Sequence, residues 1–395
     1  MSSWSPWRTV VAFGLVSLAA DMVYEGMRSV SGPFLGSLGA SALTVGIVTG
    51  AGEGIALVLR LLTGPWADRS HRHWRLTVVG YAMTAVCVPL LAVAPFLGAA
   101  GVGVAATLVL LERTGKAVRS PSKSALLARM AVGTGQGRGF AVHKALDQVG
   151  AFAGPLLLAG VLALTGRYWP GFALLAVPGL VSLLLLAQLR RRVPSITRPD
   201  PAERLDAPRT PLPRVFHVFS LSSALTTAGL MTFGVISYRW VDTGLVGAAA
   251  VPLVYALAMA VEALVALATG DLFDRWGAGV LLAVPALTVA VPLTVFSDRL
   301  WLVLVGVVAW GAGTGVQDST VKAYVAGLVP TGRRATAYGV FAAVQGVGAL
   351  AGGTVAGALV ERHVGLLAAG IAVLQVAAAA LLAATLRVSA RSAAR

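Results

Sequence analysis

The chain has 395 residues, of which 57% are hydrophobic and only 12% are charged. Soluble domains carry about 25% charged residues, so too little polar surface remains here to cover a water-soluble globule. The abundance of Leu, Val, Ala and Phe excludes a disordered chain, and a single cysteine excludes a disulfide scaffold. The composition therefore predicts a polytopic membrane protein.

Twelve apolar stretches follow one another along the chain, each about long enough to cross roughly 30 Å of hydrocarbon as a helix. They lie near residues 9–36, 43–63, 76–97, 99–118, 138–163, 170–189, 214–238, 247–269, 278–296, 300–323, 336–360 and 365–386. The first stretch contains Asp21, Glu25 and Arg28 and lacks a small-residue cleavage site before them. We interpret it as a retained helix and not as a signal peptide. The expected fold is an all-α membrane protein with twelve transmembrane helices.

The net charge of +15 would by itself suggest a nucleic-acid partner, but the basic residues fall between the apolar stretches. With the N-terminus inside, 21 basic residues lie in the inner connections and 4 in the outer ones. The positive-inside rule then places both termini in the cytoplasm. We expect a multi-pass protein of the inner (plasma) membrane that contacts lipids and does not bind nucleic acid.

Internal repeats indicate two halves. The motif Gly-x-x-x-Asp-Arg follows the second span and recurs after the eighth, 206 residues later. The motif Val-Gly-Ala-x-Ala-Gly occurs in the fifth and eleventh spans at an offset of 198. Between the halves, residues 190–213 are rich in proline and charge, which favours a cytoplasmic linker. We expect an N-terminal six-helix bundle over residues 1–189 and a C-terminal one over 214–395.

At these motifs the chain resembles the major facilitator superfamily, over essentially its whole length. Parallel six-helix repeats are the architecture of these transporters. The loop after the second span is similar to a family signature, and the resemblance implies a gate that locks the halves together on the cytoplasmic side. Gly64 would allow close helix approach, and Asp68 would pair with a helix end or an arginine. The implied gating residues are Gly64, Asp68, Arg69, Gly270, Asp274 and Arg275.

A second resemblance concerns the fifth span. Gly150, Gly154 and Pro155 are similar to part of the antiporter signature that the family's drug exporters carry. Small residues let helices pack closely, and Pro155 frees a backbone carbonyl and permits bending. Close packing alone, without antiport, explains these residues equally well.

Charged residues inside the spans are the strongest functional signal, because each costs about 2.5–3.5 kcal/mol at the bilayer centre. Asp21, Glu25 and Arg28 share one helical face, which must line a cavity or a partner helix. Two acids one turn apart repel when both are ionised, so one of them can load and release a proton. His143 and Asp147 lie four residues apart in the fifth span. The expected proton-coupling residues are Asp21, Glu25, His143 and Asp147.

Other intramembrane charges and aromatic side chains are expected to line the substrate cavity. Lys144 with Asp147, and Asp318 with Lys322, are explained equally well as structural ion pairs. Arg119 lies near the inner boundary, where snorkelling would explain it. The expected cavity residues are Tyr24, Arg28, Glu53, Glu112, Arg113, Lys116, Lys144, Phe233, Trp310, Asp318 and Lys322.

The sequence contains no hydrolase, metalloprotease or nucleotide-binding motif, so we expect no enzyme, no cofactor and no bound metal. The resemblance and the intramembrane acids favour a monomeric secondary transporter that exports an amphiphilic or cationic small molecule in exchange for protons. One alternative is a proton-coupled symporter, in which basic side chains bind the carboxylate or phosphate of an anionic metabolite. Another is a non-transporting membrane receptor or scaffold.

Overall fold

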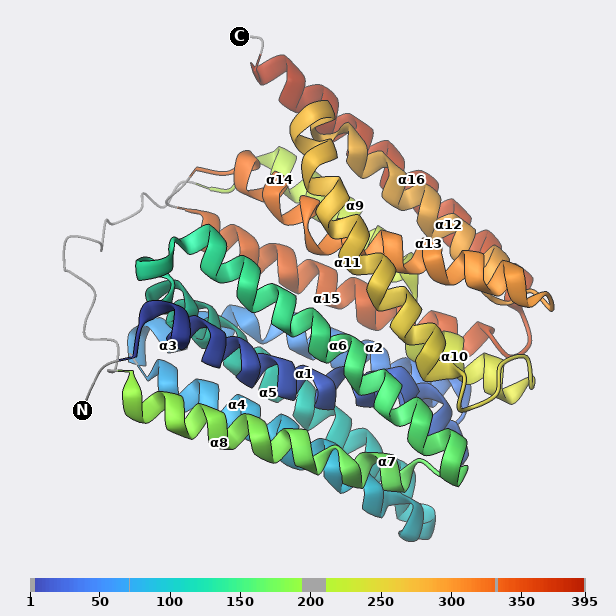
Figure 1. Cartoon of the computed structure of the whole chain (residues 1–395). Helices are drawn as coiled ribbons and strands as arrows, with labels where there is room; N and C mark the ends of the chain where they lie inside the picture. The colour runs from blue at the N-terminus through green and yellow to red at the C-terminus, as the bar shows by residue number, and fades with distance from the viewer. Residues whose placement is uncertain (1–3, 71, 194–210, 331–332, 394–395) are drawn as a thin grey trace. The chain divides into compact units, whose positions relative to one another are not determined.

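The computed structural model describes residues 4–70, 72–193, 211–330 and 333–393. Within these residues the chain forms sixteen α-helices and a few short 3-10 helices, without a strand (Figure 1). The prediction of an all-α protein is therefore confirmed.

The first eight helices are α1 (Pro6–Ser37), α2 (Ala42–Val58), α3 (Arg60–Ser70), α4 (His73–Leu90), α5 (Gly101–Met130), α6 (Gln136–Thr165), α7 (Trp169–Leu174) and α8 (Ala176–Arg192). The others are α9 (Arg214–Leu230), α10 (Phe233–Asp242), α11 (Val251–Trp276), α12 (Ala283–Val295), α13 (Leu300–Asp318), α14 (Thr320–Leu328), α15 (Arg334–Leu359) and α16 (Val364–Ala393). The 3-10 helix η5 (Gly277–Leu282) joins α11 to α12.

Ten stretches of the described chain are long and apolar enough to cross a membrane. One of them, Val251–Val295, has 45 residues and holds both α11 and α12, which is enough for two crossings. Helix α5 is not among the ten, although its 30 residues are long enough, because it carries many charged side chains. With these two adjustments the helices agree with the twelve expected spans.

Four of the expected spans consist of two helices each. The breaks fall at Leu59, Leu175, Ser319 and the pair Met231 and Thr232. Met231 has φ +57°, in the left-handed region that non-glycine residues rarely adopt, so the helix cannot continue through it. Its carbonyl oxygen accepts a hydrogen bond from Nε1 of Trp310 at 3.4 Å, which satisfies a backbone group that the break exposes.

The helices pack into two compact units. The first comprises the described residues of 1–40, 62–199 and 246–256, and the second comprises those of 41–61, 200–245 and 257–395. In the first unit α1 packs against α6 and α8, and α4 packs against α5 (Figure 1). In the second unit α15 packs against α2 and α9, and α12 against α13. The expected bundle division at 190–213 stays a prediction, and residues 194–210 of that linker lie outside the described chain.

Glycines set the closest helix crossing of the first unit. A Cβ atom on Gly150 of α6 would collide with the carbonyl oxygen of Leu18 on α1. A Cβ on Gly154 would collide in the same way with the carbonyl of Met22. The backbones of α1 and α6 therefore touch, as expected for small residues at a membrane helix interface.

The same crossing recurs in the second unit. Gly348 and Gly352 of α15 meet the carbonyl oxygens of Ala224 and Ala228 of α9. These glycines are the repeat equivalents of Gly150 and Gly154, and the two alanines follow Leu18 and Met22 by 206 residues. The sequence repeat is thus a repeat of helix packing.

The opposite face of α15 packs against α2. Gly353 of α15 lies against the backbone of Gly46, and a Cβ on Gly346 would lie 3.0 Å from the carbonyl oxygen of Gly54. The two helix backbones are therefore in contact along several turns.

The start of α2 is hydrogen-bonded to Glu361, which lies in the turn after α15. The N–H of Ala42 donates to Oε1 of Glu361 at 3.0 Å. The hydroxyl of Tyr238 donates to the same carboxylate oxygen at 3.1 Å. Because an anion is favourable at a helix N-terminus, Glu361 stabilises the first turn of α2.

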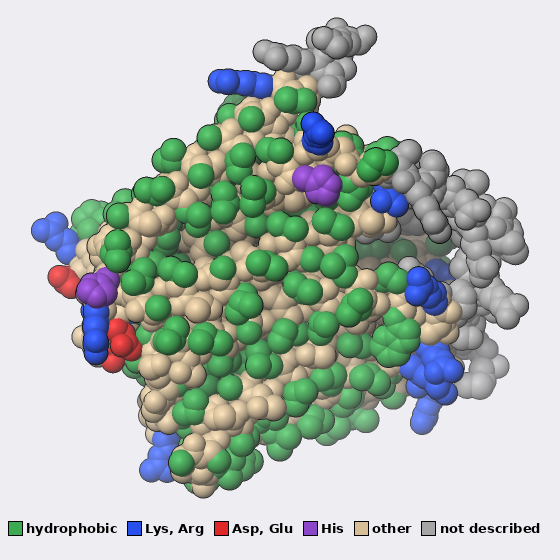
Figure 2. Space-filling model, turned by 180° about the vertical axis from the view of Figure 1, so that it is seen from behind, with side chains coloured by type: hydrophobic (Ala, Val, Ile, Leu, Met, Phe, Trp, Pro, Cys, Tyr) green, Lys and Arg blue, Asp and Glu red, His purple; other side chains and the backbone are tan. Residues whose placement is uncertain are grey.

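Hydrophobic side chains are spread over the face seen in Figure 2, with lysines and arginines at its margins. Large apolar side chains are well exposed, among them Leu164 at 89%, Leu267 at 75% and Val373 at 72%. Such side chains are favourable in hydrocarbon and unfavourable in water. The surface therefore fits a protein embedded in lipid.

Candidate functional site

Three helices of the first unit bring ionisable side chains together. On α5, Glu112, Lys116, Arg119 and Lys123 follow a helical spacing of four, three and four residues, so they share one face. The whole set, which we call the charge cluster, consists of Asp21, Glu25 and Arg28 of α1, Glu112, Arg113, Lys116, Arg119 and Lys123 of α5, and His143 and Asp147 of α6.

Arg119 is the centre of one part of the cluster. Its guanidinium lies 3.9 Å from the carboxylates of both Asp21 and Glu112. It donates to Oγ1 of Thr84 at 2.5 Å and stacks 4.8 Å from the ring centroid of Tyr81. The residue is only 4% exposed. The interpretation of Arg119 as a snorkelling side chain is therefore wrong, because its charge is compensated inside the unit.

Asp147 is the centre of another part. Nζ of Lys123 donates to its Oδ1 at 3.3 Å, and Nδ1 of His143 lies 3.9 Å from the same oxygen. The sequence placed Lys123 in a connection after the fourth span, but α5 continues past it to Met130. Lys144, the expected partner of Asp147, has an exposed side chain.

A chain of hydrogen bonds joins α6 to α4 through α1. Nε2 of His143 lies 3.0 Å from Oγ of Ser17, and that hydroxyl lies 2.9 Å from the hydroxyl of Tyr81. His143 is 3% exposed, and its ring packs edge-on against Phe13 with 5.5 Å between the centroids. Since each hydroxyl can both donate and accept, the chain can orient protons in either direction.

Tyr24 of α1 holds two basic side chains of α5. Arg113 donates to its hydroxyl and stacks over its ring with 4.5 Å between the guanidinium carbon and the ring centroid. Nζ of Lys116 lies 3.8 Å from the same centroid, a cation–π geometry. Nε of Arg113 also lies 3.7 Å from Oε2 of Glu112. These contacts bring Tyr24, Arg113, Lys116 and Glu112 together, and their role in lining a substrate cavity stays a prediction.

Glu25 contacts other residues than the acids Asp21 and Asp147 do. Nη1 of Arg28 lies 3.6 Å from its Oε2, and the hydroxyl of Tyr255 donates to the same oxygen at 2.5 Å. Tyr255 lies in the first turns of α11, within the segment that packs in the first unit. The partners of Glu25 thus differ from those of Asp21, which pairs with Arg119.

Five expected cavity residues belong to the second unit and not to the unit of the charge cluster. Phe233 and Trp310 are buried there, with 5.7 Å between their ring centroids. Glu53 is half-buried on α2. Asp318 is exposed at the end of α13, and the break at Ser319 places Lys322 on the next helix, α14. The side chain of Lys322 lies outside the described residues.

The expected gating motifs are helical, because they form the ends of α3 and α11 and not loops. Among the described residues, a Cβ on Gly64 or Gly270 would meet no atom within 4 Å, and the close helix approach at Gly64 stays a prediction. Arg69, Asp274 and Arg275 are exposed. The side chain of Asp68 lies outside the described residues.

Sequence reasoning missed several members of the site. Ser17, Tyr81 and Thr84 are uncharged polar residues in hydrophobic spans, and Tyr255 is a tyrosine in an apolar helix. Lys123 was counted as a connection residue. Polar side chains in several apolar spans indicate that these side chains contact one another. The sequence does not show which spans are neighbours.

Comparison with known proteins identifies relatives of the chain. The family model of the Major Facilitator Superfamily matches residues 13–296 and 246–395. An uncharacterized protein of Mycobacterium tuberculosis is 49% identical over 383 residues, which cover 95% of this chain and 92% of the relative. The fosmidomycin resistance protein of Escherichia coli is 28% identical over 214 residues, which cover 54% of this chain and 50% of the relative.

Among solved structures, a variant of the nucleoside transporter NupG has a TM-score of 0.77 at 14% identity. The alignment covers 95% of this chain and 99% of that one. At this identity the likeness concerns the fold alone.

Proposed function

The chain belongs to the Major Facilitator Superfamily, and on this premise we propose that it exports an amphiphilic small molecule in exchange for protons. One observation carries the proposal. Two carboxylates on different helices, Asp21 and Asp147, are each paired with a base of a third helix, Arg119 and Lys123. Buried ion pairs of this kind respond to protonation, because a proton removes one charge and leaves its partner uncompensated.

The helix arrangement links protonation of the acids to the position of α5 relative to α1 and α6. Gly150 and Gly154 hold α6 against α1, so both acids sit on one closely packed helix pair. Both bases sit on α5. A proton on Asp21 or Asp147 therefore weakens the attraction between α5 and the α1–α6 pair, and its release restores that attraction. A secondary transporter needs such a link between protonation and helix position.

The hydrogen-bond chain through Ser17 supports a proton route within the cluster. It links His143, which lies beside Asp147, to Tyr81, on which Arg119 stacks. The two links measure 2.9 and 3.0 Å, so a proton could pass along them by rotation of the hydroxyls. The same route connects the neighbourhoods of the two acids.

The direction of transport is supported by the relative whose name denotes fosmidomycin resistance, since export is one route to resistance. The charge cluster contains four acidic residues, five lysines and arginines, and His143. This balance favours the second candidate, proton-coupled uptake of an anionic metabolite.

A proteoliposome experiment separates the two candidates. Purified protein is reconstituted with a pH-sensitive dye inside vesicles that hold a preformed pH gradient. Export by antiport predicts that the lipophilic cation tetraphenylphosphonium dissipates the gradient faster than in empty vesicles, while p-toluenesulfonate does not. The reverse pattern would support the anion symporter.

A matched pair of variants completes the test. Asp147→Asn should remove the substrate-dependent proton flux. Asp242→Asn should leave it unchanged, because Asp242 is an exposed acid that pairs with Arg239 at 3.5 Å outside the charge cluster. Equal proton flux in wild type and Asp147→Asn, for every substrate that moves, would contradict proton coupling through this site.

A further inference from the structure

Arg119 of α5 lies between two carboxylates and forms a close ion pair with neither. Its Nη2 lies 3.9 Å from Oδ1 of Asp21 on α1, and its Nη1 lies 3.9 Å from Oε1 of Glu112 on its own helix. A direct charge-assisted hydrogen bond measures about 2.7–2.9 Å, so neither contact is one. The guanidinium is therefore shared between α1 and α5, and a small movement can bring it to either acid.

Thr84 of α4 links Arg119 to Glu112. A guanidinium can only donate, so Oγ1 of Thr84 accepts from Nη1 of Arg119 at 2.5 Å. The hydroxyl then donates to Oε1 of Glu112 at 3.0 Å, because the backbone oxygen of Gly80 at 3.5 Å is the poorer acceptor. Glu112 is the final acceptor of this chain, a role that suits an ionised carboxylate.

The two acids differ in their access to protons. Glu112 is completely buried, at 0% exposure, and its Oε2 lies 3.7 Å from Nε of Arg113. The side chain of Asp21 is 19% exposed. A proton therefore reaches Asp21 more readily than Glu112, so Asp21 suits proton exchange and Glu112 suits a permanent charge.

Arg119 and Glu112 are surrounded by other charged and titratable groups. Among the described residues, those that face them are Asp21 of α1, Tyr81 and Cys87 of α4, and Arg113, Lys116 and Lys123 of α5. Asp147 of α6 lies beyond Lys123, with which it pairs at 3.3 Å. Asp21 is therefore the acid that competes with Glu112 for the guanidinium.

Helix packing holds Arg119 and Glu112 against α4. A Cβ on Gly80 of α4 would collide with Cβ of Arg119 and with the carbonyl oxygen of Gly115. Helices α4 and α5 thus form a close pair, as α1 and α6 do. If Arg119 turns from Asp21 to Glu112, its charge stays within the α4–α5 pair and the attachment of α5 to α1 is lost.

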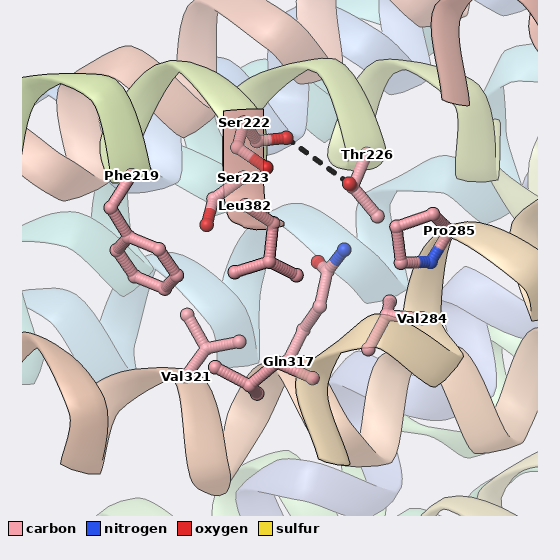
Figure 3. Close-up of a pocket in the computed structure, with 10 residues that line it drawn as sticks. Phe219, Ser222, Ser223, Thr226, Val284, Pro285, Gln317, Val321 and Leu382 are labelled. Carbon is pink, nitrogen blue, oxygen red and sulfur yellow. Dashed lines mark hydrogen bonds between the residues drawn. The ribbon is translucent and has the colours of Figure 1, made fainter. Parts of the chain in front are cut away.

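The second unit shows that the repeated helices pack without such charges. Thr227 of α9 follows Asp21 by 206 residues, and Gln345 of α15 follows Asp147 by 198, the two offsets at which the packing glycines and their partners repeat. Nε2 of Gln345 donates to Oγ1 of Thr227 at 3.4 Å. The ten side chains drawn in Figure 3, from α9 and the helices around it, are all uncharged. Close packing therefore does not require acids and bases, which supports a functional role for those of the first unit.

We infer that Glu112 is a positioning residue, a fixed counter-ion that takes over Arg119 when Asp21 accepts a proton. The inference rests on the proposed function, because it describes the protonated state of Asp21 in the transport cycle. Protonation leaves Arg119 with one carboxylate, so the guanidinium moves from the contact between α1 and α5 to a contact within α5. Glu112 thereby removes the cost of an uncompensated buried charge, which would otherwise oppose proton uptake.

A cycle of melting temperatures tests this inference on the full chain in lipid nanodiscs, without substrate or pH gradient. Asp21→Asn imitates the protonated acid. Glu112→Gln should lower the melting temperature at least about twice as much in the Asp21→Asn background as in the wild type, because Arg119 then loses both carboxylates. Arg113 loses Glu112 equally in both backgrounds, so its contribution cancels. Equal losses in the two backgrounds would overturn the inference.

The pH dependence of stability separates a counter-ion from a merely structural residue. When a lower pH protonates Asp21, the wild type still has Glu112 for Arg119, whereas Glu112→Gln does not. The difference in melting temperature between the two should therefore widen toward acid pH. Asp242→Asn changes an exposed acid outside the charge cluster, and its difference from the wild type should not widen. A difference for Glu112→Gln that stays constant or narrows would overturn the inference.

A triple variant covers the case in which the double variant does not fold. Adding Arg119→Leu to Asp21→Asn and Glu112→Gln removes the uncompensated charge. The triple variant should melt at a higher temperature than the double variant, or fold where the double variant does not. A triple variant that is no more stable would overturn the inference. Because these measurements need no transport, a failed proteoliposome test beside an intact cycle would contradict the proposed function and not the role of Glu112.

Discussion

Arg119 of α5 and Asp21 of α1 form an ion pair of 3.9 Å in which the two side chains are 5% and 19% exposed. Such a pair is stable only while both charges are present, because either one alone is poorly solvated. Arg119 also contacts Glu112, so the loss of Asp21 leaves it one acidic neighbour.

The first prediction is a double-mutant cycle on this pair. Arg119→Leu should destabilise the protein by about 3 kcal/mol, because Asp21 loses a buried partner. Asp21→Asn should cost less, since Glu112 still compensates Arg119. The double variant should be more stable than the sum of the single losses predicts. Thermal unfolding in nanodiscs measures all three, and strict additivity would show that the two side chains do not interact.

The second prediction separates coupling from transport. Asp21→Asn keeps the size and most of the hydrogen bonding of the side chain but cannot release a proton. We expect this variant to exchange labelled for unlabelled substrate across the membrane while failing to accumulate it against a pH gradient. In this variant the accumulation should also no longer depend on pH. Gradient-driven accumulation equal to that of the wild type would assign coupling to other residues.

The third prediction concerns the α1–α6 crossing. Gly154→Ala places a methyl group against the carbonyl oxygen of Met22 and should destabilise the protein by about 1–3 kcal/mol. Gly160→Ala, on the same helix, meets no atom within 4 Å. It should instead stabilise by about 0.5–1 kcal/mol, because alanine is the better helix former. Opposite signs in a thermal unfolding assay confirm the crossing, and equal effects would contradict it.

The fourth prediction concerns the start of α2. Glu361→Ala removes the acceptor of the Ala42 N–H and of the Tyr238 hydroxyl, so the first turn of α2 should open more often. We expect faster amide hydrogen exchange there, equivalent to about 0.5–1 kcal/mol. Arg362→Ala alters the next, also exposed, residue and should leave this exchange unchanged. Unchanged exchange in Glu361→Ala would show that the carboxylate contributes nothing to the helix end.

The helical spans and their repeats could be predicted from the sequence, but the length of α5 could not. Hydropathy counts each charge from Glu112 to Lys123 as a cost, so the expected span ended at residue 118. In the structure α5 continues to Met130, because Arg119 and Lys123 have acidic partners on α1 and α6. The compensation of a charge depends on neighbours that a single helix pattern does not contain.

The members of the site were predicted better than their pairing. The periodicity of α1 identified Asp21, Glu25 and Arg28 as one face. It could not show that Arg119 pairs with Asp21, or that Tyr255 bonds to Glu25, because both contacts join distant parts of the sequence. Helix periodicity specifies faces, whereas packing decides which faces meet.

Helix α15 carries glycines on two opposite faces, those that touch α2 and those that touch α9. In a deep mutational scan these glycines should tolerate almost no substitution, although glycine has no side chain that could contact a substrate. A helix that tolerates few substitutions could then be taken for a substrate-binding helix, although in α15 the cause is the close packing of the glycines. Gln345 lies on the same helix, and its Nε2 donates to Thr227 at 3.4 Å. Loss of transport without loss of protein abundance at this position would therefore report on function and not on helix packing.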